Sequence, residues 1–145
     1  MNLVVCVDDK NGMMFHDRRQ SQDRVLREKI LAETADSRLW MNDYSHGQFS
    51  QEPAAVPSAS PPNHVFIDED FLEKTSPGDY CFVEDRSVAS YEGSIERIIL
   101  YKWNRVYPAD RYFDIPLKKN GWKLETAEDF AGSSHEKITK EVYRR

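Results

Sequence analysis

The densest group of chemically active side chains lies between His16 and Arg24. It combines arginines, aspartates and one histidine with Ser21, which we predict to cap the N-terminus of a helix. Helix N-termini and guanidinium groups both bind anions. We therefore predict that a small anionic or nucleotide-like ligand binds here, with contacts from Arg18, Arg19, Gln20, Ser21 and Arg24. The alternative is a solvated helix start whose charges pair with one another.

The same segment could also support proton transfer. His16 and Asp23 could form an acid–base pair, and Arg18 could stabilise developing charge. Such a pair would make the protein a small metal-independent nuclease or phosphodiesterase, which we keep as an alternative function. The simpler interpretation is that His16 is an ordinary surface residue. His16, His46, His64 and His135 show none of the spacings of known metal motifs, so we predict no metal site.

Acidic residues follow several predicted strands. Asp8-Asp9, Asp68-Glu69-Asp70 and Glu84-Asp85 could meet at neighbouring strand ends and bind Mg²⁺ or Ca²⁺. We favour the simpler interpretation that each acid ends a strand in solvent. A stretch from Tyr101 to Phe113 mixes aromatic and basic residues, which can bind single strands of nucleic acid. Core packing explains most of these aromatics better.

The composition limits the class of protein. The chain has 145 residues, enough for one domain, and a net charge of −5, which argues against nucleic acid as a partner. We predict no membrane partner, because the charge is negative and no apolar run approaches the length of a membrane span. The N-terminus has no basic region and no long apolar run, so we predict a cytoplasmic protein. Cys6 and Cys81 lie in apolar runs and are predicted to be buried thiols, with a redox pair as the alternative.

Hydrophobic patterning predicts the elements that position these residues. Early strands are short apolar runs, whereas the last two alternate apolar and polar residues, which indicates a mainly parallel sheet with an antiparallel C-terminal pair. The predicted strands are 3–7, 39–41, 65–67, 80–83, 98–103, 122–126 and 138–143. We expect a helix from Ser21 to about Ala35-Asp36, an irregular loop at 13–20, and a flexible Pro/Ala/Ser loop at 53–62. We expect the whole of 1–145 to form a single α/β domain.

The order of these elements resembles dihydrofolate reductase. The matching segments are Val5-Cys6-Val7-Asp8, Asn11-Gly12-Met13, Leu39-Trp40-Met41, Glu96 to Trp103, Ala109 to Phe113, Trp122 and the ending Val142-Tyr143-Arg144-Arg145. The resemblance implies a three-layer α/β fold. It also implies a substrate cleft beside the segment around Arg18 and Arg19.

The residues that the family uses to bind NADPH phosphates are replaced. Where the family has an Arg and a Thr after the second strand, this chain has Asn42-Asp43-Tyr44-Ser45. Where the family has Ser/Thr-Arg after the next strand, it has Asp68-Glu69. Where the family has Gly-Gly, it has Val83-Glu84-Asp85-Arg86. Carboxylates at about 4 Å from a phosphate cost about 1 kcal/mol each in water and about 4 near a protein surface. The resemblance therefore implies that no cofactor is bound and that NADPH in particular is unlikely; Ser45 and Arg86 remain as candidate anion contacts.

The folate side departs from the family as well. The family has Leu-Pro-Trp and then a helix acid that assists pterin protonation; here the segment reads Arg18 to Arg24, and Asp23 is the nearest carboxylate to take a catalytic role. We therefore predict a reductase-like protein without NADPH-dependent activity. A divergent reductase with another cofactor, such as NADH or flavin, is an alternative. A homodimer through an exposed edge strand is also possible.

Overall fold

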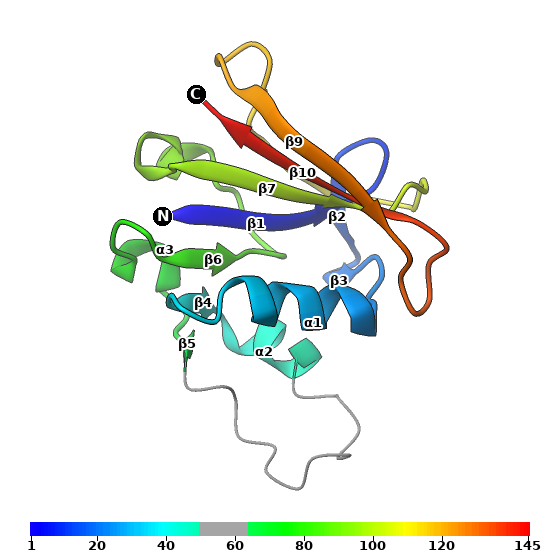
Figure 1. The fold of residues 1–145 in the computed structure, drawn as a ribbon, viewed down its shortest axis with the longest axis horizontal. Coiled ribbons are helices and arrows are strands. Elements are labelled where there is room, and N and C mark those ends of the chain that lie inside the picture. Colours follow the sequence, from blue (N-terminus) through cyan, green and yellow to red (C-terminus); the bar gives the residue numbers. More distant parts are fainter. Residues whose placement is uncertain (50–63) are drawn as a thin grey trace, which may run out of the picture.

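The computed structural model describes residues 1–49 and 64–145, so the predicted loop 53–62 lies outside the described residues. The strands of the large sheet are β1 (Asn2–Val7), β4 (Leu39–Met41), β5 (Val65–Ile67), β6 (Tyr80–Phe82), β7 (Arg97–Lys102), β9 (Lys123–Phe130) and β10 (Ile138–Arg144). In the described part of the chain these seven strands lie side by side in the order β5-β4-β6-β1-β7-β10-β9 (Figure 1).

Strand direction confirms the predicted fold class. β1 pairs in parallel with β6 and β7, and β4 pairs in parallel with β5 and β6. Strand β10 runs antiparallel to β7, and β9 runs antiparallel to β10. β1 and β7 lie inside the sheet and are covered on both faces, which explains why their sequences are nearly continuous apolar runs.

The two faces of the large sheet carry separate cores. Helices α1 (Arg24–Glu33) and α2 (Asp43–Phe49) pack on one face, where Val4 and Ile99 contribute to the core. The other face packs against α3 (Phe71–Lys74), the 3₁₀ turn η1 (Ala89–Ser94) and a small sheet, and there Leu3 and Leu100 are buried. Alternate residues of β1 and β7 thus point to opposite faces, as the strand period requires.

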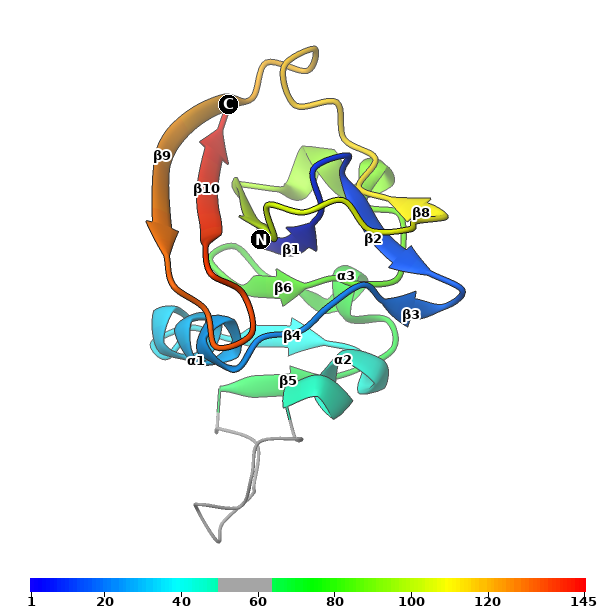
Figure 2. The ribbon, with the colours of Figure 1, turned by 90° about the vertical axis from the view of Figure 1, so that its right-hand side faces the viewer.

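The small sheet consists of β2 (Gly12–Phe15), β3 (Arg18–Arg19) and β8 (Arg111–Tyr112), in the order β3-β2-β8. It lies near the end of the large sheet towards which the arrows of β1 and β6 point (Figure 2). The prediction of an irregular loop at 13–20 was wrong, because β2 and β3 form a hairpin. His16 and Asp17 make its two-residue turn with φ of +51° and +59°, the conformation that such turns need.

Helix α1 begins later than predicted. Its N-cap is Asp23, whose carboxylate accepts a hydrogen bond from Leu26 N at 3.2 Å, so the prediction of Ser21 as the N-cap was wrong. The helix ends at Glu33, and the Thr34 hydroxyl donates to the carbonyl of Ile30 at 2.8 Å. Ser21 is thereby left outside the helix, in the segment that joins β3 to α1.

The two edges of the large sheet are exposed. Strand β5 was predicted to be buried, but Phe66 and Ile67 are 39% and 40% exposed because β5 is an edge strand. Strand β9 forms the opposite edge and is mostly exposed, so it is less covered than the half-buried strand predicted at 122–126. Among the described residues, no helix combines the length and apolar character needed to span a bilayer.

Candidate functional site

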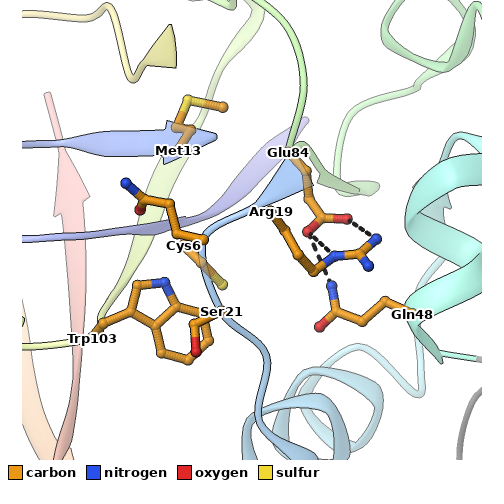
Figure 3. Close-up of a pocket in the computed structure, with 8 residues that line it drawn as sticks. Cys6, Met13, Arg19, Ser21, Gln48, Glu84 and Trp103 are labelled. Carbon is orange, nitrogen blue, oxygen red and sulfur yellow. Dashed lines mark hydrogen bonds and ion pairs between the residues drawn. The ribbon is translucent and has the colours of Figure 1, made fainter. Parts of the chain in front are cut away.

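A small cavity lies where the parallel strands β1 and β6 and the segment after β7 meet the hairpin and α2. In open α/β sheets, the carboxyl ends of parallel strands are where ligands bind. The residues that line the cavity are Cys6, Met13, Arg19, Gln20, Ser21, Gln48, Glu84 and Trp103 (Figure 3). Its volume of about 10 Å³ is close to the space that one water molecule needs. Small-molecule pockets usually have about 300–1,000 Å³.

Arg19 and Glu84 fill the space that a larger ligand would need. Nε of Arg19 donates to Oε2 of Glu84 at 2.9 Å, and Nη2 donates to Oε1 at 3.2 Å, so the pair is bidentate. Gln48 donates to the same carboxylate at 3.0 Å (Figure 3). The guanidinium also lies 4.3 Å from the centre of the Tyr44 ring and donates to the Tyr44 carbonyl at 3.1 Å. Hydrogen bonding and attraction to Glu84 outweigh burial and raise the pKa of Arg19.

Gln20 carries a buried acceptor beside this pair. Its amide nitrogen donates to Asp8 Oδ2 at 3.1 Å and to the carbonyl of Pro108 at 3.3 Å. Its amide oxygen is buried and has no hydrogen-bond partner in the described part of the chain. Burial alone would raise the pKa of Asp8, but hydrogen bonds from Gly12, Lys10 and Tyr107 N–H and from Gln20 lower it. Asp8 is therefore a fixed anion that orients Gln20.

The remaining predicted ligand contacts are dispersed. Arg18 is exposed in β3, and Arg24 is exposed and pairs with Glu28 at 3.0 Å. Arg86 donates to the carbonyl of Glu69 at 2.7 Å and to Asp85 at 3.0 Å. The buried hydroxyl of Ser45 has no hydrogen-bond partner among the described residues. Of the predicted set, the structure brings only Arg19, Gln20 and Ser21 to the cavity.

The two predicted acid–base residues do not contact each other. His16 lies in the exposed hairpin turn, where its backbone N–H donates to Asp110 at 3.1 Å. Asp23 is 1% exposed, and its Oδ2 lies 3.2 Å from Nδ1 of His135. His135 is a residue that the sequence interpretation did not single out. Its Ser-Ser-His context matches no motif, so the sequence contained no signal for it.

Asp23 is held as a carboxylate by several donors. Burial opposes its ionisation, but the backbone N–H groups of Ser133 and Ser134, the side chain of His135 and the N–H of Leu26 more than compensate. The pKa of Asp23 therefore lies well below its usual range. The carboxylate joins the start of α1 to the loop between β9 and β10, so both segments are fixed relative to the cavity.

The acids that the sequence resemblance predicts in place of phosphate-binding residues lie near the ends of β4, β5 and β6. Asn42 donates to Asp85 at 2.9 Å, and the backbone N–H of Asp43 donates to Glu69 at 2.9 Å. Arg86 joins Glu69 to Asp85. Within residues 1–49 and 64–145, no group of three His, Cys, Asp or Glu side chains is placed to hold a metal ion.

The two cysteines lie in different surroundings, Cys6 at the cavity and Cys81 in the core. Cys81 is fully buried, as predicted, and desolvation raises its pKa to about 12. Cys6 is half-buried and lines the cavity, where desolvation and the charge of Glu84 raise its pKa well above the ordinary value, despite the opposing charge of Arg19. Both cysteines are free thiols.

These features define the class of fold. A mainly parallel sheet with an antiparallel C-terminal pair and α-helices on both faces is the dihydrofolate reductase-like fold. Among solved structures, the chain is similar to dihydrofolate reductase from Enterococcus faecalis complexed with NADP(H) and RAB-propyl. The TM-score is 0.64 at 8% sequence identity, and the alignment covers 99% of this chain and 95% of that chain. At this identity, the similarity establishes the fold alone. No family model and no curated protein matches the sequence.

Proposed function

We propose that this protein is a non-reductase with a dihydrofolate reductase-like fold, and that it binds a small anionic or nucleotide-like ligand at Arg19. The bidentate Arg19–Glu84 pair carries the proposal. Its two N–H···O contacts, at 2.9 and 3.2 Å, have the geometry with which a guanidinium binds a carboxylate or a phosphate. A ligand anion would replace the Glu84 carboxylate on the same fork.

The surroundings of Arg19 support this exchange. The guanidinium is also oriented by the Tyr44 ring and carbonyl, and these contacts do not involve Glu84. Gln20, which lines the same cavity, has a buried amide oxygen without a hydrogen-bond partner among the described residues. Such an oxygen costs free energy until a donor reaches it. A ligand with a hydroxyl or amino group beside its anionic group would satisfy it.

We also propose that the chain does not bind NADPH. The cofactor's phosphates would meet Glu69 and Asp85 near the ends of β5 and β6, and both acids are already fixed by Arg86. Residues Val83 to Arg86 include no glycine, so their side chains occupy the space that a close backbone approach to pyrophosphate requires. The residues present do not fit the cofactor, and we assign no reductive step to this protein.

Of the two alternatives, a nuclease that uses His16 and Asp23 has less support, because Asp23 contacts His135. A divergent reductase with NADH would require only loss of the 2′-phosphate contacts, but it would meet the same obstacle at Val83 to Arg86.

The test of anion binding is isothermal titration calorimetry with inorganic phosphate, pyrophosphate, AMP and citrate. We expect at least one of them to bind with a Kd below about 1 mM. The variant Glu84→Gln should bind more tightly because the competing charge is gone, and Arg19→Ala should not bind. Arg24→Ala is the matched control, since Arg24 is exposed and pairs with Glu28. Unchanged titrations for Arg19→Ala, or no binding to any of the four anions, would refute the proposal.

A further inference from the structure

Ser21, His135 and Asp23 form a continuous row of hydrogen bonds beside the cavity. The Ser21 hydroxyl lies 3.0 Å from Nε2 of His135, and Nδ1 of the same ring lies 3.2 Å from Oδ2 of Asp23. Both distances lie in or at the edge of the range in which a serine nucleophile, its base and the orienting acid interact. Ser21 lines the cavity, while Asp23 and His135 are buried behind it.

The environment fixes the tautomer of His135. Asp23 is an acceptor, and its carboxylate lies against Nδ1, so this nitrogen must carry the proton. The Ser134 hydroxyl also approaches Nδ1, at 3.1 Å, and it can donate its proton to the carbonyl of Gln22 at 2.9 Å. In the neutral ring, Nε2 then presents its lone pair to Ser21. This is the arrangement in which a histidine can remove a proton from a serine.

The ring of His135 is also held in place from its face. Trp103 stacks on it with a distance of 4.6 Å between ring centres. The Tyr107 hydroxyl lies 3.2 Å from Nε2 and therefore shares the lone pair with Ser21. Ser21 itself is only partly buried and is thus the most exposed member of the row, since Asp23 and His135 are both buried.

We propose that Ser21 is a nucleophile, activated by His135 and positioned through Asp23, and that the protein hydrolyses small carboxylic esters. The Ser21 Oγ attacks the ester carbonyl carbon while its proton moves to Nε2 of His135. The C–O bond to the leaving alcohol then breaks, and His135 returns the proton to that alcohol. Water attacks the acyl-serine with His135 as base, and this releases the acid and regenerates Ser21.

This inference is independent of anion binding at Arg19. Among the described residues, no hydrogen bond or ion pair joins the row to the Arg19–Glu84 pair, although Arg19 and Ser21 line the same cavity. Arg19→Ala therefore tests anion binding, and Ser21→Ala tests the nucleophile.

The experiment measures hydrolysis of p-nitrophenyl acetate together with labelling by a fluorophosphonate, followed by peptide mapping. All proteins carry Cys6→Ala, so that a thiol in the same cavity cannot be acylated. We expect one label per chain, on Ser21, and a hydrolysis rate that Ser21→Ala lowers by about tenfold or more. The matched control is Ser94→Ala, because Ser94 is exposed in η1. The control should keep the full rate and the label.

Two further variants separate chemistry from structure. Tyr107→Phe removes the hydroxyl that competes for Nε2 of His135, so its rate should exceed that of the parent. Ser21→Cys keeps a nucleophilic side chain at position 21, so the ester should still acylate this residue. Acylation of the cysteine would show that the reaction depends on a nucleophile at this position and not on the fold alone. Label on another residue, no label at all, or an unchanged rate in Ser21→Ala would overturn the proposal.

Discussion

The Asp23 carboxylate and the His135 imidazole are in contact at 3.2 Å, although 112 positions separate them in the sequence. Asp23 also accepts hydrogen bonds from the backbone of Ser133 and Ser134, at 3.0 and 2.8 Å. One side chain thus caps a helix and anchors the loop between β9 and β10. Several measurable properties of the protein depend on this and a few other contacts.

The first prediction concerns Asp23 and pH. Its pKa is depressed in the folded state, so its stabilisation is present above the unfolded pKa of about 3.9 and is lost as the pH falls below that value. Asp23→Asn should therefore lower the free energy of unfolding by about 2 kcal/mol at pH 7 and by less at pH 3. Urea unfolding at both pH values measures the difference. An equal loss at both would show that the charge contributes nothing.

The second prediction concerns Gly12, at the start of β2. A Cβ atom there would lie 2.6 Å from Nε2 of Gln20 and 2.7 Å from Cβ of Ala109. Gly12→Ala should therefore destabilise the fold by about 1–3 kcal/mol, as overpacking does. Gly93→Ala is the matched control, because a Cβ there meets nothing within 4 Å. Thermal unfolding should give a lower melting temperature for Gly12→Ala than for Gly93→Ala. Equal melting temperatures would contradict the close packing around Gly12.

The third prediction concerns the thiols. Desolvation raises the pKa of Cys81 to about 12 and raises that of Cys6 as well, so both are protonated at pH 8. Because the thiolate is the reactive form, the folded protein should react slowly with Ellman's reagent. Addition of guanidinium chloride should expose both thiols to fast reaction. Rapid labelling of the folded protein would contradict the burial of one of them, and mass mapping would identify which.

The fourth prediction concerns nicotinamide cofactors. On the proposed function, fluorescence titration with NADPH should give a Kd weaker than about 1 mM, because Glu69 and Asp85 would oppose the phosphates. NADH should bind equally poorly, since the segment Val83 to Arg86, which has no glycine, would obstruct the pyrophosphate that the two cofactors share. Micromolar binding of either one would restore the divergent reductase as the better explanation.

The sequence by itself determined the strands of the large sheet and the presence of helix α1. The apolar runs at 3–7 and 98–103 indicated buried strands, and the alternation in 138–143 indicated an antiparallel strand. These patterns depend on residues that are neighbours in the chain, so local reading is sufficient. The hairpin β2–β3 was not predicted, because its two-residue turn is His16-Asp17 and not the Asn-Gly pair that usually marks such a turn.

Only the tertiary structure decided how the site is composed. Arg19 was a candidate from sequence, but its partner Glu84 lies 65 positions away, and the pair fills the cavity. Asp23 was expected beside His16 and instead contacts His135. Side-chain partners across such separations are set by the packing of the whole sheet, which brings distant chain segments to one place. A pattern of residue types along the chain does not contain that information.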